Sequence, residues 1–99
     1  MFVVIWEYEV HAGRESEFAA LYSGEGAWAA LFREYAGYVA TELLRDAMQP
    51  QRFLTIDRWT SRAAYDAFLA AANPRYAEID ALGDALTSNE RCVGRFETA

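Results

Sequence analysis

Four segments of the chain are rich in apolar residues with β-branched or aromatic side chains, and polar or glycine-containing stretches separate them. These residue types predict strands over Phe2–Val10, Tyr38–Asp46, Arg52–Trp59 and Ser88–Glu97. Between the second and third strands, Gln49–Gln51 is a turn with proline at its centre. In the last strand, the period of two places Cys92, Gly94 and Phe96 on one face.

The first strand carries apolar side chains on both of its faces near its start. One face holds Phe2, Val4, Trp6, Tyr8 and Val10, and the other begins with Val3 and Ile5. A strand of this kind is covered on both sides. We therefore expect helices on one side of the sheet and a second subunit on the other.

Helical spacing fills the interval between the first two strands. Arg14–Tyr22 forms a first helical segment with Phe18 and Leu21 inward, and two glycines within Ser23–Gly26 interrupt it. The spacing i, i+3, i+4, i+7 then resumes with Trp28, Leu31, Phe32 and Tyr35. Gly37 is a plausible helix end.

A second helical interval follows the third strand. Ser61 is placed to cap a helix whose apolar stripe consists of Tyr65, Phe68, Leu69 and Ala72. Asn73-Pro74 restarts the helix, with asparagine as the cap and proline at the first helical position. The buried face then continues through Tyr76, Ile79, Leu82 and Leu86.

The order of elements is β-α-β-β-α-β, and no linker or charge block divides it. Such a chain folds most simply as an α+β, ferredoxin-like domain over residues 1–99, with a four-stranded antiparallel sheet and the helices on one face. Hydrophobic residues make up 54% of the chain and aromatics 15%. That much apolar surface predicts a homodimer in which two sheets meet as a dimeric α+β barrel.

Charge and residue types exclude several classes of function. The net charge is −6 and all nine cations are arginines scattered along the chain, whereas nucleic-acid binding needs a clustered basic surface. Without lysine there is no Schiff-base chemistry, and one histidine with one cysteine cannot build a structural zinc site. No GxSxG, GxGxxG or Gly-Lys phosphate loop is present. Carboxylates, tyrosines and tryptophans remain, so we expect no metal and no cofactor.

The single histidine, the single cysteine and the lack of long apolar segments bear on where the protein is found. His11 falls in a solvated turn, and Cys92 packs as a small hydrophobe and cannot form an internal disulfide. No apolar run reaches the ~20 residues that a membrane span needs, and the first strand starts without a basic signal region. We therefore expect a cytoplasmic location and no membrane or nucleic-acid partner.

The sequence resembles the antibiotic biosynthesis monooxygenase domains of the dimeric α+β barrel superfamily over nearly its whole length. The resemblance rests on Glu7–Arg14, Phe18, Trp28, Phe32, Gly37-Tyr38, Thr41–Asp46, Asp57–Ser61, Phe68, Tyr76 and Gly94–Phe96. This family includes cofactor-free oxygenases that act on electron-rich phenols, so the resemblance implies a reaction in which the deprotonated substrate itself reduces dioxygen. The protein then supplies a dry pocket, a proton acceptor and hydrogen bonds.

Two known catalytic sets of this family do not match the chain. Heme-degrading relatives use an asparagine on the first strand, where Trp6 stands here, and a histidine on the second helix, but no histidine follows His11. Quinol-oxygenase-like relatives often carry a histidine at the position of Phe68. The resemblance therefore implies either a divergent oxygenase or a protein without catalysis.

Asp57 is the most informative polar residue, because it lies in an otherwise apolar strand and shares a face with Trp59 and Thr55. A carboxylate beside a tryptophan in an apolar pocket has a raised pKa, which suits a general base. The alternative is a carboxylate paired with an arginine at the dimer seam. Trp59 matches the family tryptophan before the second helix, either lining the pocket or anchoring the core.

Two tyrosines and four further aromatic residues complete the candidate site. Tyr65 and Tyr76 can donate hydrogen bonds to a substrate oxygen or a peroxide, or they are core tyrosines. The apolar wall that binds substrate consists of Trp6, Trp28, Phe32 and Phe68, although such a stripe is also typical of plain core.

We therefore predict a homodimeric, cofactor-independent monooxygenase that binds dioxygen and oxidises a flat hydroxylated aromatic such as an anthrone, naphthol or quinol. Two alternatives stay open. One is a non-catalytic ligand-binding or stress-response barrel of the same fold, and the other is a structural dimer whose own side chains fill the pocket.

Overall fold

The computed structural model describes residues 1–99 as one antiparallel sheet covered by helices. The sheet has the order β2-β3-β1-β4. Its strands are β1 (Phe2–Val10), β2 (Tyr38–Arg45), β3 (Arg52–Trp59) and β4 (Thr87–Glu97). The helices are α1 (Glu15–Tyr22), α2 (Ala27–Phe32), α3 (Arg62–Ala71) and α4 (Arg75–Asp84). The prediction of a ferredoxin-like β-α-β-β-α-β fold is confirmed, with each helical interval split into two helices.

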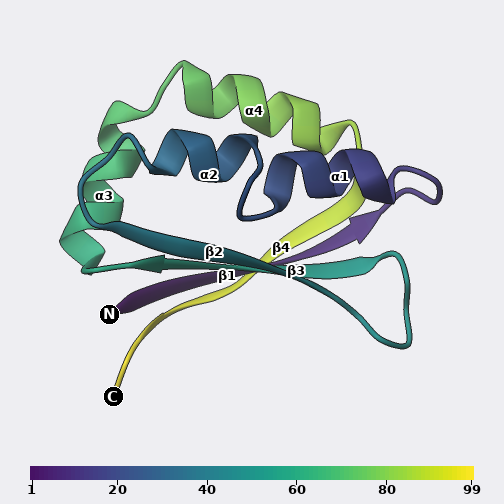
Figure 1. Cartoon of the computed structure of the whole chain (residues 1–99), viewed down its shortest axis with the longest axis horizontal. Coiled ribbons are helices and arrows are strands. Elements are labelled where there is room, and N and C mark those ends of the chain that lie inside the picture. Colours follow the sequence, from purple (N-terminus) through teal and green to yellow (C-terminus); the bar gives the residue numbers. More distant parts are fainter.

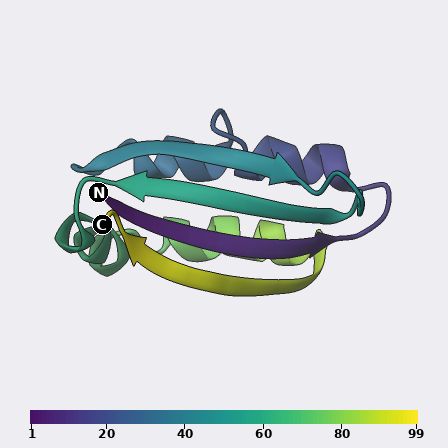
Figure 2. The ribbon, with the colours of Figure 1, turned by 90° about the horizontal axis from the view of Figure 1, so that it is seen from below.

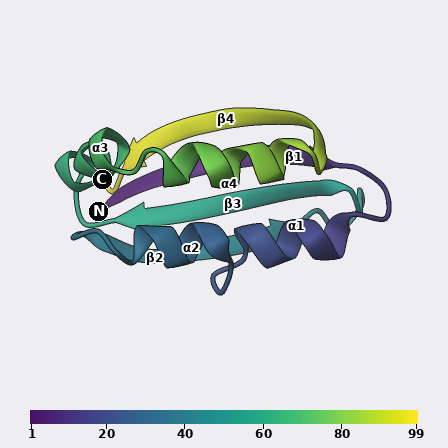
Figure 3. The ribbon, with the colours of Figure 1, turned by 90° about the horizontal axis from the view of Figure 1, so that it is seen from above.

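All four helices lie on the same face of the sheet, and the opposite face is bare (Figures 1 and 2). Seen from above, α1 and α2 lie along the β2 side of the sheet and α4 lies along the β1 and β4 side, with α3 at one end (Figure 3). None of these helices is long and apolar enough to cross a membrane.

Local chemistry explains where the helices start and stop. Gly26 separates α1 from α2 at a point where a Cβ atom would collide with the carbonyl group of Leu21. Ser61 caps α3 as expected, because its Oγ accepts a hydrogen bond of 3.1 Å from the amide of Ala64. The cap of α4 is Pro74 and not Asn73, so the helix starts one residue later than the sequence suggests.

Aromatic side chains fill the space between the sheet and the helices. Trp59 of β3, Phe18 of α1 and Phe68 of α3 are almost completely buried there. The predicted inward face of β1 is confirmed, with Trp6 the least buried of its five residues. In α1 the inward residues are Phe18 and Tyr22, whereas Leu21 is only half-buried.

A β-bulge in β4 overturns the predicted face of that strand. Cys92 pairs with Trp6 and Gly94 pairs with Ile5, so the extra residue Val93 shifts the register between them. Cys92 therefore shares the helix-side face with Trp6, while Gly94 and Phe96 lie on the bare face. Cys92 is also exposed, so the prediction that it packs as a small hydrophobe is wrong.

The buried face of α4 also differs from the prediction. Leu82 was expected to be buried, but 59% of it is exposed. The fully buried α4 residue is instead Gly83, which packs against the hydroxyl group of Tyr22 so closely that a Cβ atom would overlap it. Tyr76 and Ile79 are half-buried and Leu86 is buried, as expected.

The bare side of the sheet, called the open face below, carries an apolar centre with charges around it. Register places Val3, Ile5, Leu44, Leu54, Ile56 and Phe96 on this side. Leu44 and Phe96 are exposed. Ion pairs from Arg52 to Glu7 and Asp46, and from Arg58 to Glu42, lie on its two flanks.

Candidate functional site

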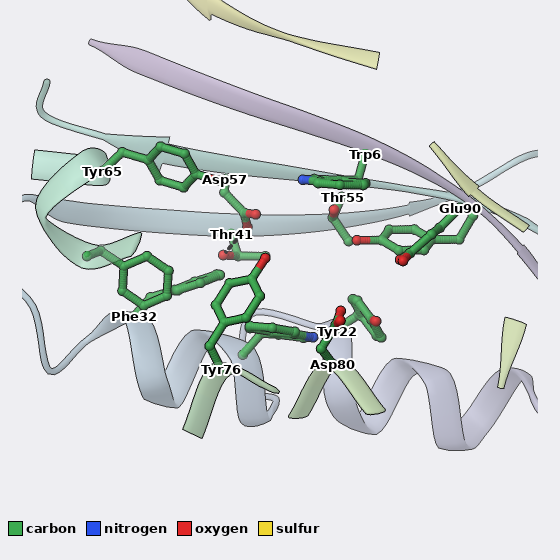
Figure 4. Close-up of a pocket in the computed structure, with 13 residues that line it drawn as sticks. Trp6, Tyr22, Phe32, Thr41, Thr55, Asp57, Tyr65, Tyr76, Asp80 and Glu90 are labelled. Atoms are coloured by element: carbon green, nitrogen blue, oxygen red, sulfur yellow. Dashed lines mark hydrogen bonds between the residues drawn. The ribbon is translucent and has the colours of Figure 1, made fainter. Parts of the chain in front are cut away.

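A cleft of about 550 Å³, including its mouth to solvent, lies between the sheet and the helices. Its lining residues come from all four strands and all four helices (Figure 4). They are Trp6, Tyr8, Tyr22, Trp28, Phe32, Thr41, Thr55, Asp57, Tyr65, Phe68, Tyr76, Asp80 and Glu90. Seven of the eight predicted site residues are therefore brought together around one cavity, and only Trp59 is not.

Asp57 sits in the central strand β3 between Val4 of β1 and Thr41 of β2. Its side chain is 8% exposed and forms no ion pair with any arginine, so the predicted alternative of a salt bridge is not seen in the chain. Burial raises the pKa of Asp57 to about 6, and the hydrogen bond from Thr41 partly opposes this rise. A carboxyl group with this pKa can change its protonation state near neutrality.

A chain of hydroxyl groups leads to one oxygen of this carboxylate. The Tyr38 hydroxyl donates a hydrogen bond of 2.8 Å to Thr41 Oγ1, and Thr41 Oγ1 donates one of 2.7 Å to Asp57 Oδ1. The second carboxylate oxygen makes no hydrogen bond within the chain. Asp57 therefore has one oxygen held by the protein and one available to a ligand.

Tyr65 of α3 and Tyr76 of α4 approach the cleft from the helical side. Burial raises the pKa of Tyr65 to about 12 and also raises the pKa of Tyr76, so both phenols stay protonated at neutral pH. In Figure 4 the Tyr76 hydroxyl points toward Thr41 and Asp57. Both phenols are thus hydrogen-bond donors that face a ligand beside the carboxylate.

The predicted apolar wall exists, and Trp59 stands behind it. Trp6, Trp28, Phe32 and Phe68 line the cleft. Trp59 is 0% exposed and packs with ring centroids 5.6 Å from Phe32 and 5.3 Å from Phe68. Its place fits the packing-anchor interpretation, because a ligand in the cleft cannot reach the indole ring.

Several lining residues were not singled out from the sequence as site residues. They are Tyr8, Tyr22, Thr41, Thr55, Asp80 and Glu90. Asp80 and Glu90, with Asp84 beside them, form an acidic rim whose carboxylate oxygens lie within 4.8 Å of one another. Burial and mutual repulsion raise the pKa values of Asp80 and Glu90.

The family model for antibiotic biosynthesis monooxygenases matches residues 1–78. The chain belongs to the antibiotic biosynthesis monooxygenase family. The match spans β1 to the first part of α4, which includes Asp57, both tyrosines and the aromatic wall.

Several solved structures share this fold. SnoaB, a cofactor-independent oxygenase from Streptomyces nogalater, is 25% identical with a TM-score of 0.80, and the match covers 99% of this chain and 92% of SnoaB. A Bordetella bronchiseptica protein assigned to the same family is 21% identical with a TM-score of 0.78, covering 99% and 96% of the two chains. A conserved protein from Methanosarcina mazei is 14% identical with a TM-score of 0.74, covering 99% and 92%. A search of curated proteins found no match.

In this family member the cleft offers a narrow set of chemical groups. Its polar groups are carboxylates, hydroxyls and the indole N–H groups of Trp6 and Trp28. The Trp28 N–H is buried without a hydrogen-bond partner. No lysine, histidine, cysteine or arginine lines it. Such a site can accept a proton, donate hydrogen bonds and hold a flat apolar ring system, which is acid–base chemistry in dry surroundings.

The raised pKa of Asp57 predicts a pH-dependent effect on stability. Because its pKa rises from 3.8 to about 6 on folding, ionised Asp57 destabilises the folded state by up to about 3 kcal/mol at neutral pH. The destabilisation is absent below pH 4, grows as the pH rises, and is complete once the pH has passed about 6. Asp57→Asn has no such charge, so in urea unfolding it should be more stable than wild type at pH 7.5 and close to it at pH 4.

The exposed helical carboxylate Asp66, which lies 3.7 Å from Arg62, provides a matched control. Asp66→Asn should change the free energy of unfolding little at either pH, since exposed pairs contribute little. An Asp57→Asn variant that is less stable than wild type at pH 7.5 would mean that the carboxylate charge is compensated in the fold.

Proposed function

We propose that the protein is a cofactor-independent monooxygenase that oxidises a flat hydroxylated aromatic compound of the anthrone, naphthol or quinol type. The observation that carries this proposal is Asp57, a buried carboxylate without a counter-ion that opens into an aromatic cleft. Family membership and the likeness to SnoaB, a cofactor-independent oxygenase, support a monooxygenase-type function.

In the proposed reaction the substrate supplies the electrons and the protein handles one proton. A methylene carbon next to phenolic rings loses a proton to the free oxygen of Asp57. The resulting carbanion reduces dioxygen and forms a C–O bond, and the peroxide takes the proton back from Asp57. Loss of water then breaks the O–O bond and the remaining C–H bond. The net change is CH₂ plus O₂ to C=O plus H₂O.

The tyrosines act in this scheme as donors to the developing peroxide. Tyr65 and Tyr76 remain protonated, since their pKa values are raised, and they stand at the helical side of the cleft. Hydrogen bonds from fixed donors in dry surroundings stabilise a negative oxygen more than water does. Trp6, Trp28, Phe32 and Phe68 hold the ring system, while Trp59 keeps Phe32 and Phe68 in place.

The acidic rim narrows the proposed class of substrate. Asp80 and Glu90 line the cleft together with Asp57, and no cation balances them in the lining. A substrate with a carboxylate group would meet like charges at this rim, which is unfavourable. The proposed substrate is therefore a phenol without an acidic substituent.

We also propose a homodimer that forms through the open face. Its apolar centre of Val3, Ile5, Leu44, Leu54, Ile56 and Phe96 has no cover within the chain. Exposed apolar patches of this kind typically mark protein interfaces, and a two-fold axis would place this patch against its own copy. The charged pairs on its flanks would then form the polar border of the interface.

The lack of any imidazole in the cleft favours one second candidate, a non-catalytic ligand-binding protein. This candidate binds the same flat phenols but consumes no oxygen. Fluorescence titration separates both ligand-binding candidates from a dimer whose pocket is filled by its own side chains.

Oxygen uptake and tryptophan fluorescence together test the proposal. A panel of anthrones and hydroquinones is measured in chelator-treated buffer, with fluorescence titration of the same compounds to detect binding near Trp6 and Trp28. Oxygen uptake that persists with chelator supports the oxygenase. Binding without uptake across the panel supports the ligand-binding candidate, and neither binding nor uptake contradicts both.

A further inference from the structure

The hydrogen bonds around Asp57 run from the buried carboxylate toward the protein surface. Thr41 Oγ1 lies 2.7 Å from Asp57 Oδ1, and the Tyr38 hydroxyl lies 2.8 Å from Thr41 Oγ1. Both distances are normal for O–H···O hydrogen bonds. Two hydroxyl groups in series therefore connect the cleft with β2, where Tyr38 is the first residue of the strand.

The outer end of this series is close to solvent. Tyr38 is half-buried, in contrast to the buried Asp57. The exposed side chains of Arg33 and Glu25 are near enough to influence the pKa of the Tyr38 hydroxyl. The series thus begins at a half-buried residue and ends at a buried carboxylate.

We propose that Tyr38 and Thr41 form a proton relay through which Asp57 exchanges protons with solvent while a ligand closes the cleft. The proposal rests on Asp57 being the proton acceptor of the proposed oxygenase. Such a path matters because a ligand over the free oxygen of Asp57 removes water from that side. Neither Tyr38 nor Thr41 takes the proton from the substrate directly in this scheme, so they are positioning and transfer residues.

Each proton step in the relay is balanced. A proton taken from the substrate reaches the Thr41 side when the carboxyl group rotates about its last side-chain bond, a torsion with a broad two-fold profile. In the structure both hydroxyl groups donate toward Asp57, so each must first turn until Thr41 donates to Tyr38 and Tyr38 donates to water. Asp57 then passes its proton to Thr41, Thr41 passes its own proton to Tyr38, and Tyr38 passes its own to water. One proton leaves, both hydroxyl groups remain neutral, and Asp57 is again ionised. When dioxygen is present, the reverse passage along the hydrogen bonds brings a proton from water back to Asp57, which then protonates the peroxide.

Exchange of substrate hydrogen with solvent tests the relay directly. The probe is an anthrone with deuterium on its reacting methylene carbon, incubated in ordinary water without oxygen. Wild-type protein should wash deuterium out above the spontaneous rate, because Asp57 removes it and the relay releases it. Oxygen consumption by the same compound is measured separately, and the ratio of washout to oxygenation is compared between variants.

Two variants break the relay at different links. Thr41→Val removes both hydrogen bonds and Tyr38→Phe removes only the outer one. In both, Asp57 should return the same deuteron to the substrate, so the washout ratio should fall about tenfold or more. Near-ultraviolet circular dichroism confirms that each variant is folded.

Two controls separate the relay from a merely structural effect. Thr41→Ser keeps the hydroxyl group and should keep the wild-type ratio. Tyr35→Phe removes a hydroxyl group that lies outside the cleft and donates a hydrogen bond of 3.3 Å to the carbonyl of Ala71. This variant should also leave the ratio of washout to oxygenation unchanged. A wild-type ratio in both Thr41→Val and Tyr38→Phe would overturn the relay and leave Asp57 as the base. Absence of both washout and oxygenation in the wild type would overturn the oxygenase and the relay together.

Discussion

Asp57→Asn is expected to lower the rate of oxygen consumption about 100-fold or more, because an amide cannot accept the substrate proton. The substitution keeps the shape of the side chain, and its amide oxygen can still accept the hydrogen bond from Thr41. Ligand binding, measured by tryptophan fluorescence, should change much less than turnover. This pattern would show that the carboxylate serves the chemical step and not the fit of the ring system.

The wild-type rate should also depend on pH through the same group. Only ionised Asp57 accepts a proton, so kcat/KM should rise with pH through about 6, where burial places the pKa of Asp57. Asp66→Asn, on the exposed side of α3, should keep both the rate and the pH profile. An Asp57→Asn rate within about twofold of wild type would remove Asp57 from the mechanism, since a general base contributes far more.

Ile5→Arg is expected to convert the proposed dimer into a monomer. Ile5 lies near the middle of the open face, where it pairs with Ile56 of β3 and Gly94 of β4. In a dimer formed through this face, each copy would bury an unpaired guanidinium group, a defect that costs about 3–5 kcal/mol when a buried charge lacks its partner. Sedimentation velocity of wild type and variant over a range of concentrations measures the change.

Leu82 offers a matched control for this substitution, because it is an exposed apolar residue on the helical layer. Leu82→Arg adds the same charge on the other side of the molecule and should leave the dimer intact. A wild-type protein that sediments as a monomer at micromolar concentration would contradict the proposed dimer, as would a dimer that Ile5→Arg does not weaken.

The strands could be predicted from the sequence largely because they are rich in β-branched and aromatic residues, and β3 also has a clear period of two. The bounds of β1 and β3 agree with the prediction, and their inward faces are the expected ones. The faces in β4 could not be predicted beyond Cys92, because the bulge at Val93 adds one residue to one strand only. A single extra residue exchanges the two faces of a strand, and no local residue pattern announces it here.

The helical layer was harder to predict because its inward side is set by packing and not by hydrophobicity alone. Leu82 looked like core, yet the inward position of α4 is taken by Gly83, beside the Tyr22 hydroxyl. Similarly, Tyr22 occupies the inward place of α1 that Leu21 was expected to fill. Large polar aromatics can replace aliphatic residues in a core when a neighbour leaves room for the hydroxyl group.

Asp57 could be found from the sequence, because an acidic residue within an apolar strand is unusual. Its partner Thr41 could not be assigned, since that requires the register between β2 and β3. The turn between these strands pairs Arg45 with Phe53, and counting outward from that pair brings Thr41 opposite Asp57. The length of the β2–β3 turn therefore determines that Thr41 lies beside Asp57. The rim of Asp80 and Glu90 depends instead on how α4 packs over β4, which no local pattern specifies.

Gly83 controls the width of the cleft although it is not part of its surface. The hydroxyl group of Tyr22 occupies the space that a side chain at position 83 would need. An added methyl group there would overlap the Tyr22 hydroxyl and displace the Tyr22 ring, which lines the cleft. The Tyr22 side of the cleft is thus held in place by a residue that does not line it, so a substitution at Gly83 reshapes the cleft without changing any side chain of its lining.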